Sequence, residues 1–170
     1  MILGMSISTF TLVHVVLSLV GIFAGLIVLF GMFTSKAFNG WTALFLATTV
    51  LTSVTGFFFP ADHILPSHMV GVVSLIVLTV AILARYVSHL VGPWRWIYIA
   101  GAVLALYLNV FVGVVQAFQK LPLLSSLAPT QSEPPFLIAQ FVVLAIFIVL
   151  GILAVRLFRP QVDSAALGAA

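Results

Sequence analysis

Histidines are the side chains of this chain best suited to bind a cofactor, and two of the four occupy comparable positions. His14 falls inside the first long apolar segment, and His68 falls near the start of the third. Alternate helices of an up-and-down bundle run in the same direction, so we expect the two imidazoles at a similar depth. Imidazole is a common axial ligand of haem iron. The pair therefore predicts a b-type haem held between two helices.

Small and hydrogen-bonding residues are expected around such a macrocycle. Gly21 and Gly71 would leave room for it, and Thr52, Asn109 and Gln116 would line the pocket with hydroxyl and amide groups. Polar groups inside a bilayer are costly, so their gathering at one depth indicates a site. The alternative interpretation is helix packing, because Ser, Thr, Asn and Gln often form hydrogen bonds between membrane helices.

Spacing supports a shared polar face on two of the segments. Intervals of 4, 3 and 4 residues place side chains on one face of a helix. Two sets follow these intervals: His14, Ser18, Gly21 and Gly25 in the first segment, and Asn109, Gly113, Gln116 and Lys120 in the fourth. These faces predict a polar pocket in one half of the bilayer.

A metal ion is the second chemistry that the histidines permit. His14, His63 and His68, together with Asp62, offer imidazole and carboxylate ligands, which suit Zn, Cu or Fe. Pro66 interrupts the interval from His63 to His68, so these two do not form a helical pair one turn apart. Their spacing matches no standard zinc motif.

The composition indicates that this chain lies in a lipid bilayer. Hydrophobic residues make up 64% and charged residues 5% of the 170 residues, whereas soluble domains carry about 25% charge. The formal net charge of +3 comes from scattered residues, so no basic patch for nucleic acid is present. The absence of cysteine excludes disulfides, iron–sulfur ligation by thiolates and covalent attachment of a c-type haem.

No catalytic residue is predicted. The sequence contains no H-E-x-x-H, G-x-S-x-G, P-loop or G-x-G-x-x-G motif, and no apolar segment holds a pair of carboxylates. We therefore expect a chain that is not an enzyme by itself.

Five apolar segments predict the fold, an all-α membrane bundle forming a single domain over residues 1–170. The helices are expected at residues 10–33, 41–59, 67–90, 94–118 and 136–158, with one substantial loop at 120–135. Each segment can cross a hydrocarbon core of about 30 Å as a helix. The runs are continuous rather than alternating, which favours helices over a β-barrel.

The distribution of basic residues predicts the orientation. With the N-terminus outside, the cytoplasmic side holds Lys36, Arg85, Arg95, Arg156 and Arg159. Only Lys120 would then lie outside, which agrees with the positive-inside rule. This orientation depends on all five helices crossing the membrane.

Three stretches resemble a group of small, uncharacterised bacterial multi-pass inner-membrane proteins. They are Pro66-Ser67-His68-Met69-Val70-Gly71, residues 105–111 and the LAPTQSEPPF segment at 127–136. The resemblance implies a bacterial inner membrane and no particular activity. A looser likeness to multihelical b-type cytochromes rests on His14 and His68 alone.

The leading hypothesis is a membrane b-type haem or electron-transfer protein with its site in the outer half of the bilayer. Its partners would be other membrane or periplasmic redox subunits. The alternatives are a non-catalytic interaction or assembly subunit of a larger membrane complex, and a membrane protein that binds a small ligand or a metal. The sequence leaves open whether the chain forms a homo-oligomer.

Overall fold

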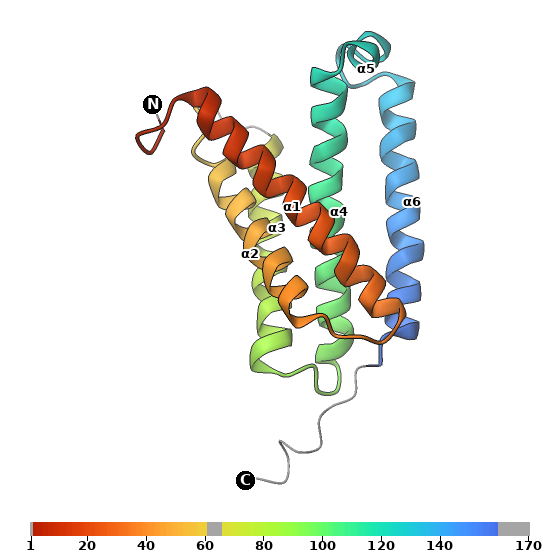
Figure 1. Ribbon diagram of the computed structural model, residues 1–170. Helices are drawn as coiled ribbons and strands as arrows, with labels where there is room; N and C mark the ends of the chain where they lie inside the picture. Colours follow the sequence, from red (N-terminus) through yellow and green to blue (C-terminus); the bar gives the residue numbers. More distant parts are fainter. Residues whose placement is uncertain (1, 61–65, 160–170) are drawn as a thin grey trace.

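All the regular elements in the computed structural model, which describes residues 2–60 and 66–159, are helices (Figure 1). They are α1 (Ile7–Phe33), α2 (Asn39–Gly56), α3 (Pro66–Ile82), the π-helical turn η1 (Leu83–Val87) that continues α3, α4 (Trp94–Lys120), the short α5 (Pro122–Leu127) and α6 (Pro134–Leu157). The expectation of an all-α chain is confirmed for these residues.

The long helices run up and down between the two ends of one bundle (Figure 1). Helix α4 is central, because it packs on α1, α3, α5 and α6. Helix α2 packs on α1 and α3, whereas α6 packs on α4 and, more lightly, on α1. The short α5 joins α4 to α6 at one end of the bundle.

Four helices are long and apolar enough to cross a membrane: α1, α3 with η1, α4 and α6. This confirms a multi-pass membrane protein. Helix α2 is not among the four, so five crossings are supported only in part. The reason is its composition, since the 18 residues of α2 include five threonines and a serine. Most of these hydroxyls turn inward, and Thr42, Thr48, Thr49 and Thr52 are buried.

Local signals explain where the helices begin and end. Helix α1 starts at Ile7 rather than at residue 10, because the Ser6 hydroxyl accepts a hydrogen bond from the Thr9 amide at 3.1 Å and caps the helix. Helix α2 ends at Gly56, three residues before the expected end. Helix α4 follows Gly92, whose positive φ of 56° forms the turn before it.

The predicted loop at 120–135 contains α5 and a turn organised by Glu133. Its carboxylate accepts hydrogen bonds from the Thr130 amide at 3.1 Å, the Thr130 hydroxyl at 2.9 Å and the Ser132 amide at 3.1 Å. Below this turn, Phe118 and Phe136 pack edge to face with their centroids 5.4 Å apart. The turn and the aromatic pair hold the ends of α4 and α6 together.

The opposite end of α6 is held by polar groups. Arg95 donates hydrogen bonds to the carbonyl oxygens of Phe158 and, at 3.2 Å, Val155. The Ser35 hydroxyl donates to the Leu157 carbonyl oxygen at 2.7 Å. The last turn of α6 is therefore tied to the start of α4 and to the connection between α1 and α2.

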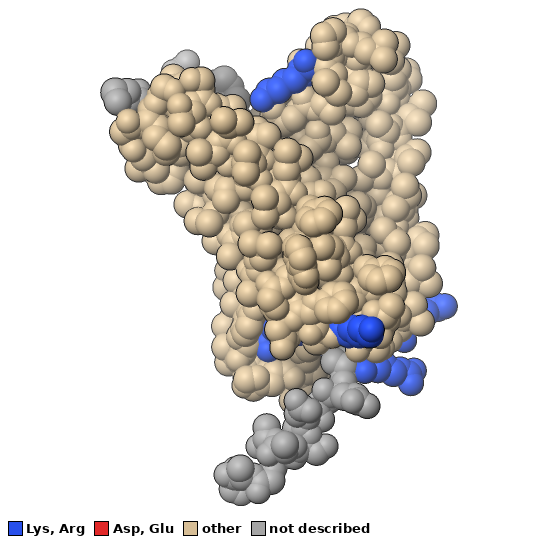
Figure 2. All heavy atoms as spheres, viewed as in Figure 1, with Lys and Arg blue, Asp and Glu red and all other residues tan. Residues whose placement is uncertain are grey.

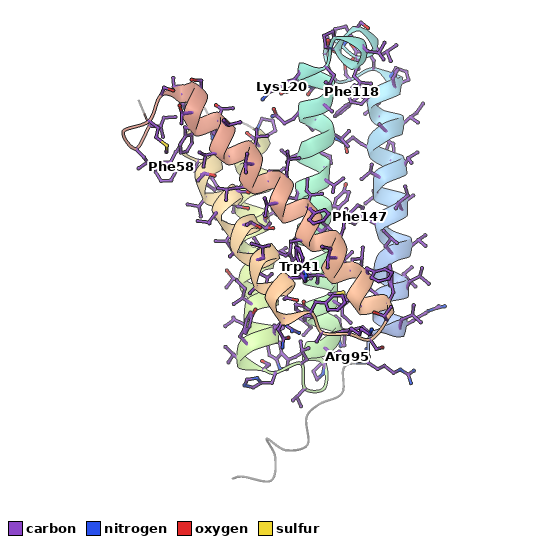
Figure 3. All side chains as sticks on the ribbon, viewed as in Figure 1. Trp41, Phe58, Arg95, Phe118, Lys120 and Phe147 are labelled. Carbon is purple, nitrogen blue, oxygen red and sulfur yellow. The ribbon has the colours of Figure 1, made fainter. Side chains whose placement is uncertain are left out.

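Basic side chains are distributed unequally between the two ends of the bundle (Figure 2). Five of the six lie at one end, which we call the arginine end: Lys36, Arg85, Arg95, Arg156 and Arg159. The sixth, Lys120, lies at the other end, together with α5 (Figures 1 and 3). We call this the Lys120 end.

Candidate functional site

A cavity of about 440 Å³ opens at the Lys120 end of the bundle. Its walls come from α1, α3 and α4, with Gly56 and Phe59 at the end of α2. The surface is visibly hollowed between the upper parts of α1 and α4 (Figure 2). Its volume falls in the range of about 300–1,000 Å³ that is typical of pockets for small ligands and cofactors.

Both predicted ligand histidines line this cavity. His14 comes from the middle of the N-terminal half of α1 and His68 from the first turn of α3, where Pro66 starts the helix. Gln116 and Lys120 line it from α4, as their helical spacing predicted. The structure thus brings together three of the seven predicted cofactor residues, His14, His68 and Gln116.

The His14 ring is oriented by a hydrogen bond to α2. Its Nδ1 atom lies 2.8 Å from the Thr55 hydroxyl oxygen. The single Thr55 proton is directed to the carbonyl oxygens of Leu51 at 2.7 Å and Thr52 at 3.1 Å. With the Thr55 proton on these carbonyl oxygens, the Nδ1–H of His14 is the donor and Nε2 carries the lone pair. Histidines that bind metals are oriented by the same kind of second hydrogen bond.

Aromatic rings support both histidines. Phe59 packs edge to face on His14, with a centroid distance of 5.2 Å. Phe57 stacks on His68, with a centroid distance of 5.6 Å and an interplanar angle of 14°. The turn that follows α2 therefore contributes one ring to each imidazole.

Gly71 serves packing rather than the cavity. A Cβ atom at this position would lie 3.0 Å from Cζ of Phe57. The absence of a side chain lets the Phe57 ring pack on α3, where it also stacks on His68. Gly71 was predicted to make room for a macrocycle, but it is not among the residues that line the cavity, and Phe57 occupies the space beside it.

Gly21 likewise lies at a helix contact and not in the cavity. A Cβ atom there would lie 3.1 Å from Asn109 Nδ2 and 3.2 Å from the hydroxyl oxygens of Thr48 and Thr49. The glycine lets α1 approach both α2 and α4. Its helical face was predicted, but the neighbouring helices occupy the space beside it.

Asn109 and Thr52 lie in a buried polar layer beneath the cavity. Ser18, which lines the cavity, donates to Asn109 Oδ1 over a long 3.4 Å. Asn109 Nδ2 and the hydroxyl oxygens of Thr49 and Thr52 are buried without a hydrogen-bond partner among the described residues. These two predicted pocket residues therefore lie below the cavity rather than on its wall.

The alternative metal site is represented only in part. Asp62 and His63 lie outside the described residues. Within residues 2–60 and 66–159, no group of three or more His, Cys, Asp or Glu side chains is arranged to hold a metal ion. His14 and His68 are the members of that proposed set that the structure places in one cavity.

Thr55 is a residue of the candidate site that was not singled out from the sequence. Thr52 was predicted for the pocket, but Thr55, one turn further along α2, is the threonine that contacts His14. Both belong to the run of threonines at Thr48, Thr52 and Thr55, whose spacing of 4 and 3 residues places them on one helical face. The structure shows that Thr55 is the member of this face that contacts His14.

Comparison of the chain with protein-family models, with curated proteins and with solved structures gave no match.

Proposed function

We propose that the cavity at the Lys120 end binds a b-type haem, with His14 and His68 as axial ligands, and that the protein transfers electrons. The observation that carries the proposal is that imidazoles from α1 and α3, 54 positions apart in the sequence, line one cavity. A haem iron bound in this way supplies one-electron redox chemistry.

Three features of the cavity suit this group. The hydrogen bond to Thr55 leaves Nε2 of His14 as the atom with a lone pair for iron. Apolar side chains such as Leu19 and Val112 cover much of the wall, as a macrocycle requires. Lys120 lines the rim and points from α4 towards α1, where its ammonium group can pair with a propionate (Figure 3).

The proposal includes a topology of five crossings, with the N-terminus outside and the C-terminus in the cytoplasm of a bacterial inner membrane. Helix α1 ends at the arginine end, and α3 begins at the Lys120 end. Helix α2 connects these ends, which supports its crossing although its threonines lower its hydropathy. The basic residues at the arginine end would then face the cytoplasm.

Absorption spectroscopy of the protein in mild detergent tests the haem. We expect a Soret band, sharp α and β bands after reduction with dithionite, and about one iron per chain. His14→Ala and His68→Ala should each remove the bis-histidine spectrum. His89→Ala is the matched control, because His89 lies after η1 near the arginine end and outside the cavity.

Two outcomes would overturn the proposal. One is a colourless, iron-free protein after expression with sufficient haem and after reconstitution with haemin. The other is a haem spectrum that neither His14→Ala nor His68→Ala alters.

A further inference from the structure

A second cavity, of about 450 Å³, lies between α4 and α6. It is a groove with almost entirely apolar walls, formed by residues such as Val103 and Leu104 on α4 and Phe147 and Ile152 on α6. Phe147 lies in the space between the two helices (Figure 3). Arg156 is the one charged residue in its lining, and it lies at the arginine end.

The length of the groove matches one leaflet of a bilayer. On α6 its lining runs from Leu144 to Arg156, an interval of 12 residues. At 1.5 Å per residue this interval spans roughly 18 Å, close to half of a hydrocarbon core of about 30 Å. An extended acyl chain with its headgroup at Arg156 would therefore reach to about the middle of the membrane.

The charge around its polar end selects an anionic headgroup. Arg156 is exposed, and Arg159, three residues further along the chain, is exposed as well. The only acidic residue in the described part of the chain is Glu133, beyond the start of α6 at the opposite end. A phosphate at Arg156 would thus meet cations and no carboxylate of that part of the chain.

Helix α6 has little protein around it to fill the groove. Among the four candidate spans it is the least buried. Its apolar surface must be covered by lipid or by another protein. The groove has the length of an acyl chain and ends at a cation, which favours lipid.

We propose that the α4–α6 groove binds one acyl chain of an anionic phospholipid and that Arg156 binds the phosphate of its headgroup. This site is separate from the proposed haem cavity, which opens at the other end of the bundle. It does not depend on whether haem is bound.

Native mass spectrometry of the full-length protein in mild detergent can test this site. The probes are phosphatidylglycerol and phosphatidylcholine with the same acyl chains. We expect phosphatidylglycerol to bind about fivefold more tightly, the effect of one cation at a membrane surface. Arg156→Gln should remove this preference. Lys36→Gln, which removes a cation of the same end outside the groove, should retain it.

A second variant tests the groove itself. Gly151 lines the groove, and a Cβ atom there would meet Val103 Cγ1 at 3.4 Å, an ordinary contact, so Gly151→Leu is chosen to fill part of the groove. Binding of both lipids at this site should then fall while the thermal unfolding temperature stays near that of the parent.

Three results would overturn the proposal. Equal binding of the two lipids would exclude recognition of the headgroup. Equal losses in Arg156→Gln and Lys36→Gln would show a general charge effect. A dimer that dissociates in Gly151→Leu, with no lipid bound to the parent, would show that the groove is an interface between two copies.

Discussion

The Nδ1 atom of His14 and the hydroxyl oxygen of Thr55 lie 2.8 Å apart and join α1 to the last turn of α2. The bond orients the ring plane of His14, and with the Thr55 proton on the carbonyl oxygens of Leu51 and Thr52 it makes Nδ1–H the donor. In this arrangement the lone pair of the imidazole lies on Nε2.

Removal of the Thr55 hydroxyl should weaken haem binding without abolishing it. Thr55→Val keeps the shape of the side chain but frees the His14 ring, and loss of such a supporting bond typically lowers metal affinity roughly 10–100-fold. The measurement is a haemin titration of the apoprotein. Thr79→Val is the control, because Thr79 is exposed on α3 and its hydroxyl also bonds a backbone carbonyl oxygen. Equal losses in both variants would contradict a specific role for Thr55.

Substitution of Gly21 should destabilise the bundle. In Gly21→Ala the new methyl group would come within 3.1–3.2 Å of the polar atoms of Asn109, Thr48 and Thr49, so these side chains must move. We expect a loss of about 1–2 kcal/mol, in the range of overpacked cores. Thermal or denaturant unfolding in detergent measures it. In Gly113→Ala the nearest atom is Ile22 Cδ1 at 3.8 Å, so that control should be neutral. If Gly21→Ala left the stability unchanged, the neighbouring side chains could move aside without cost and the prediction would be wrong.

Labelling of single cysteines should show whether α2 crosses the membrane. The chain has no cysteine, so Lys36→Cys and Ser126→Cys can be read without background. Both positions are exposed, and α2, α3 and α4 lie between them. Three crossings put the two positions on opposite sides, with Ser126→Cys reacting with an impermeant maleimide on intact spheroplasts. Reaction of both positions from one side would mean that α2 does not cross.

The turn at Glu133 should open in acid. Partial desolvation would raise the pKa of the Glu133 carboxyl, but the hydrogen bonds from Thr130 and Ser132 outweigh it, and the pKa is lowered from the ordinary value of 4.5. A lowered pKa stabilises the turn above pH 4.5, and this contribution is lost as the pH falls through the folded pKa. Hydrogen exchange of the Thr130 and Ser132 amides should accelerate over that interval, relative to the rate expected for free amides. In Glu133→Gln the exchange should lack this pH dependence.

The sequence predicts the positions of the helices and their polar faces well in this protein. Long apolar runs gave the helices to within a few residues, since only hydrogen-bonded helices can carry such runs through lipid. Spacing along α1 and α4 correctly placed His14, Gln116 and Lys120 on faces that meet at one cavity. These predictions succeed because helical geometry relates residues within one segment.

The sequence predicts poorly which side chains fill the space between neighbouring helices. Gly21 and Gly71 were expected to leave room for a ligand, but neighbouring helices and Phe57 occupy that room. Thr52 lies beneath the cavity, and Thr55 has the role near His14. These differences arise because the angle and distance between helices depend on the packing of side chains from several segments at once.

Helix α6 is held by side-chain contacts at both ends, whereas little protein surrounds its middle. One end is held by Arg95 and Ser35, and the other by Phe118 and Phe136. Between them, from Leu144 to Arg156, the groove runs along the contact of α6 with α4, and this stretch is covered by protein on one side only. Because both ends of α6 are held by contacts, a change in lateral pressure or in bilayer thickness should bend the middle of the helix before it displaces either end. The bundle therefore has one compliant wall, and its stiffness should depend on the lipid around it.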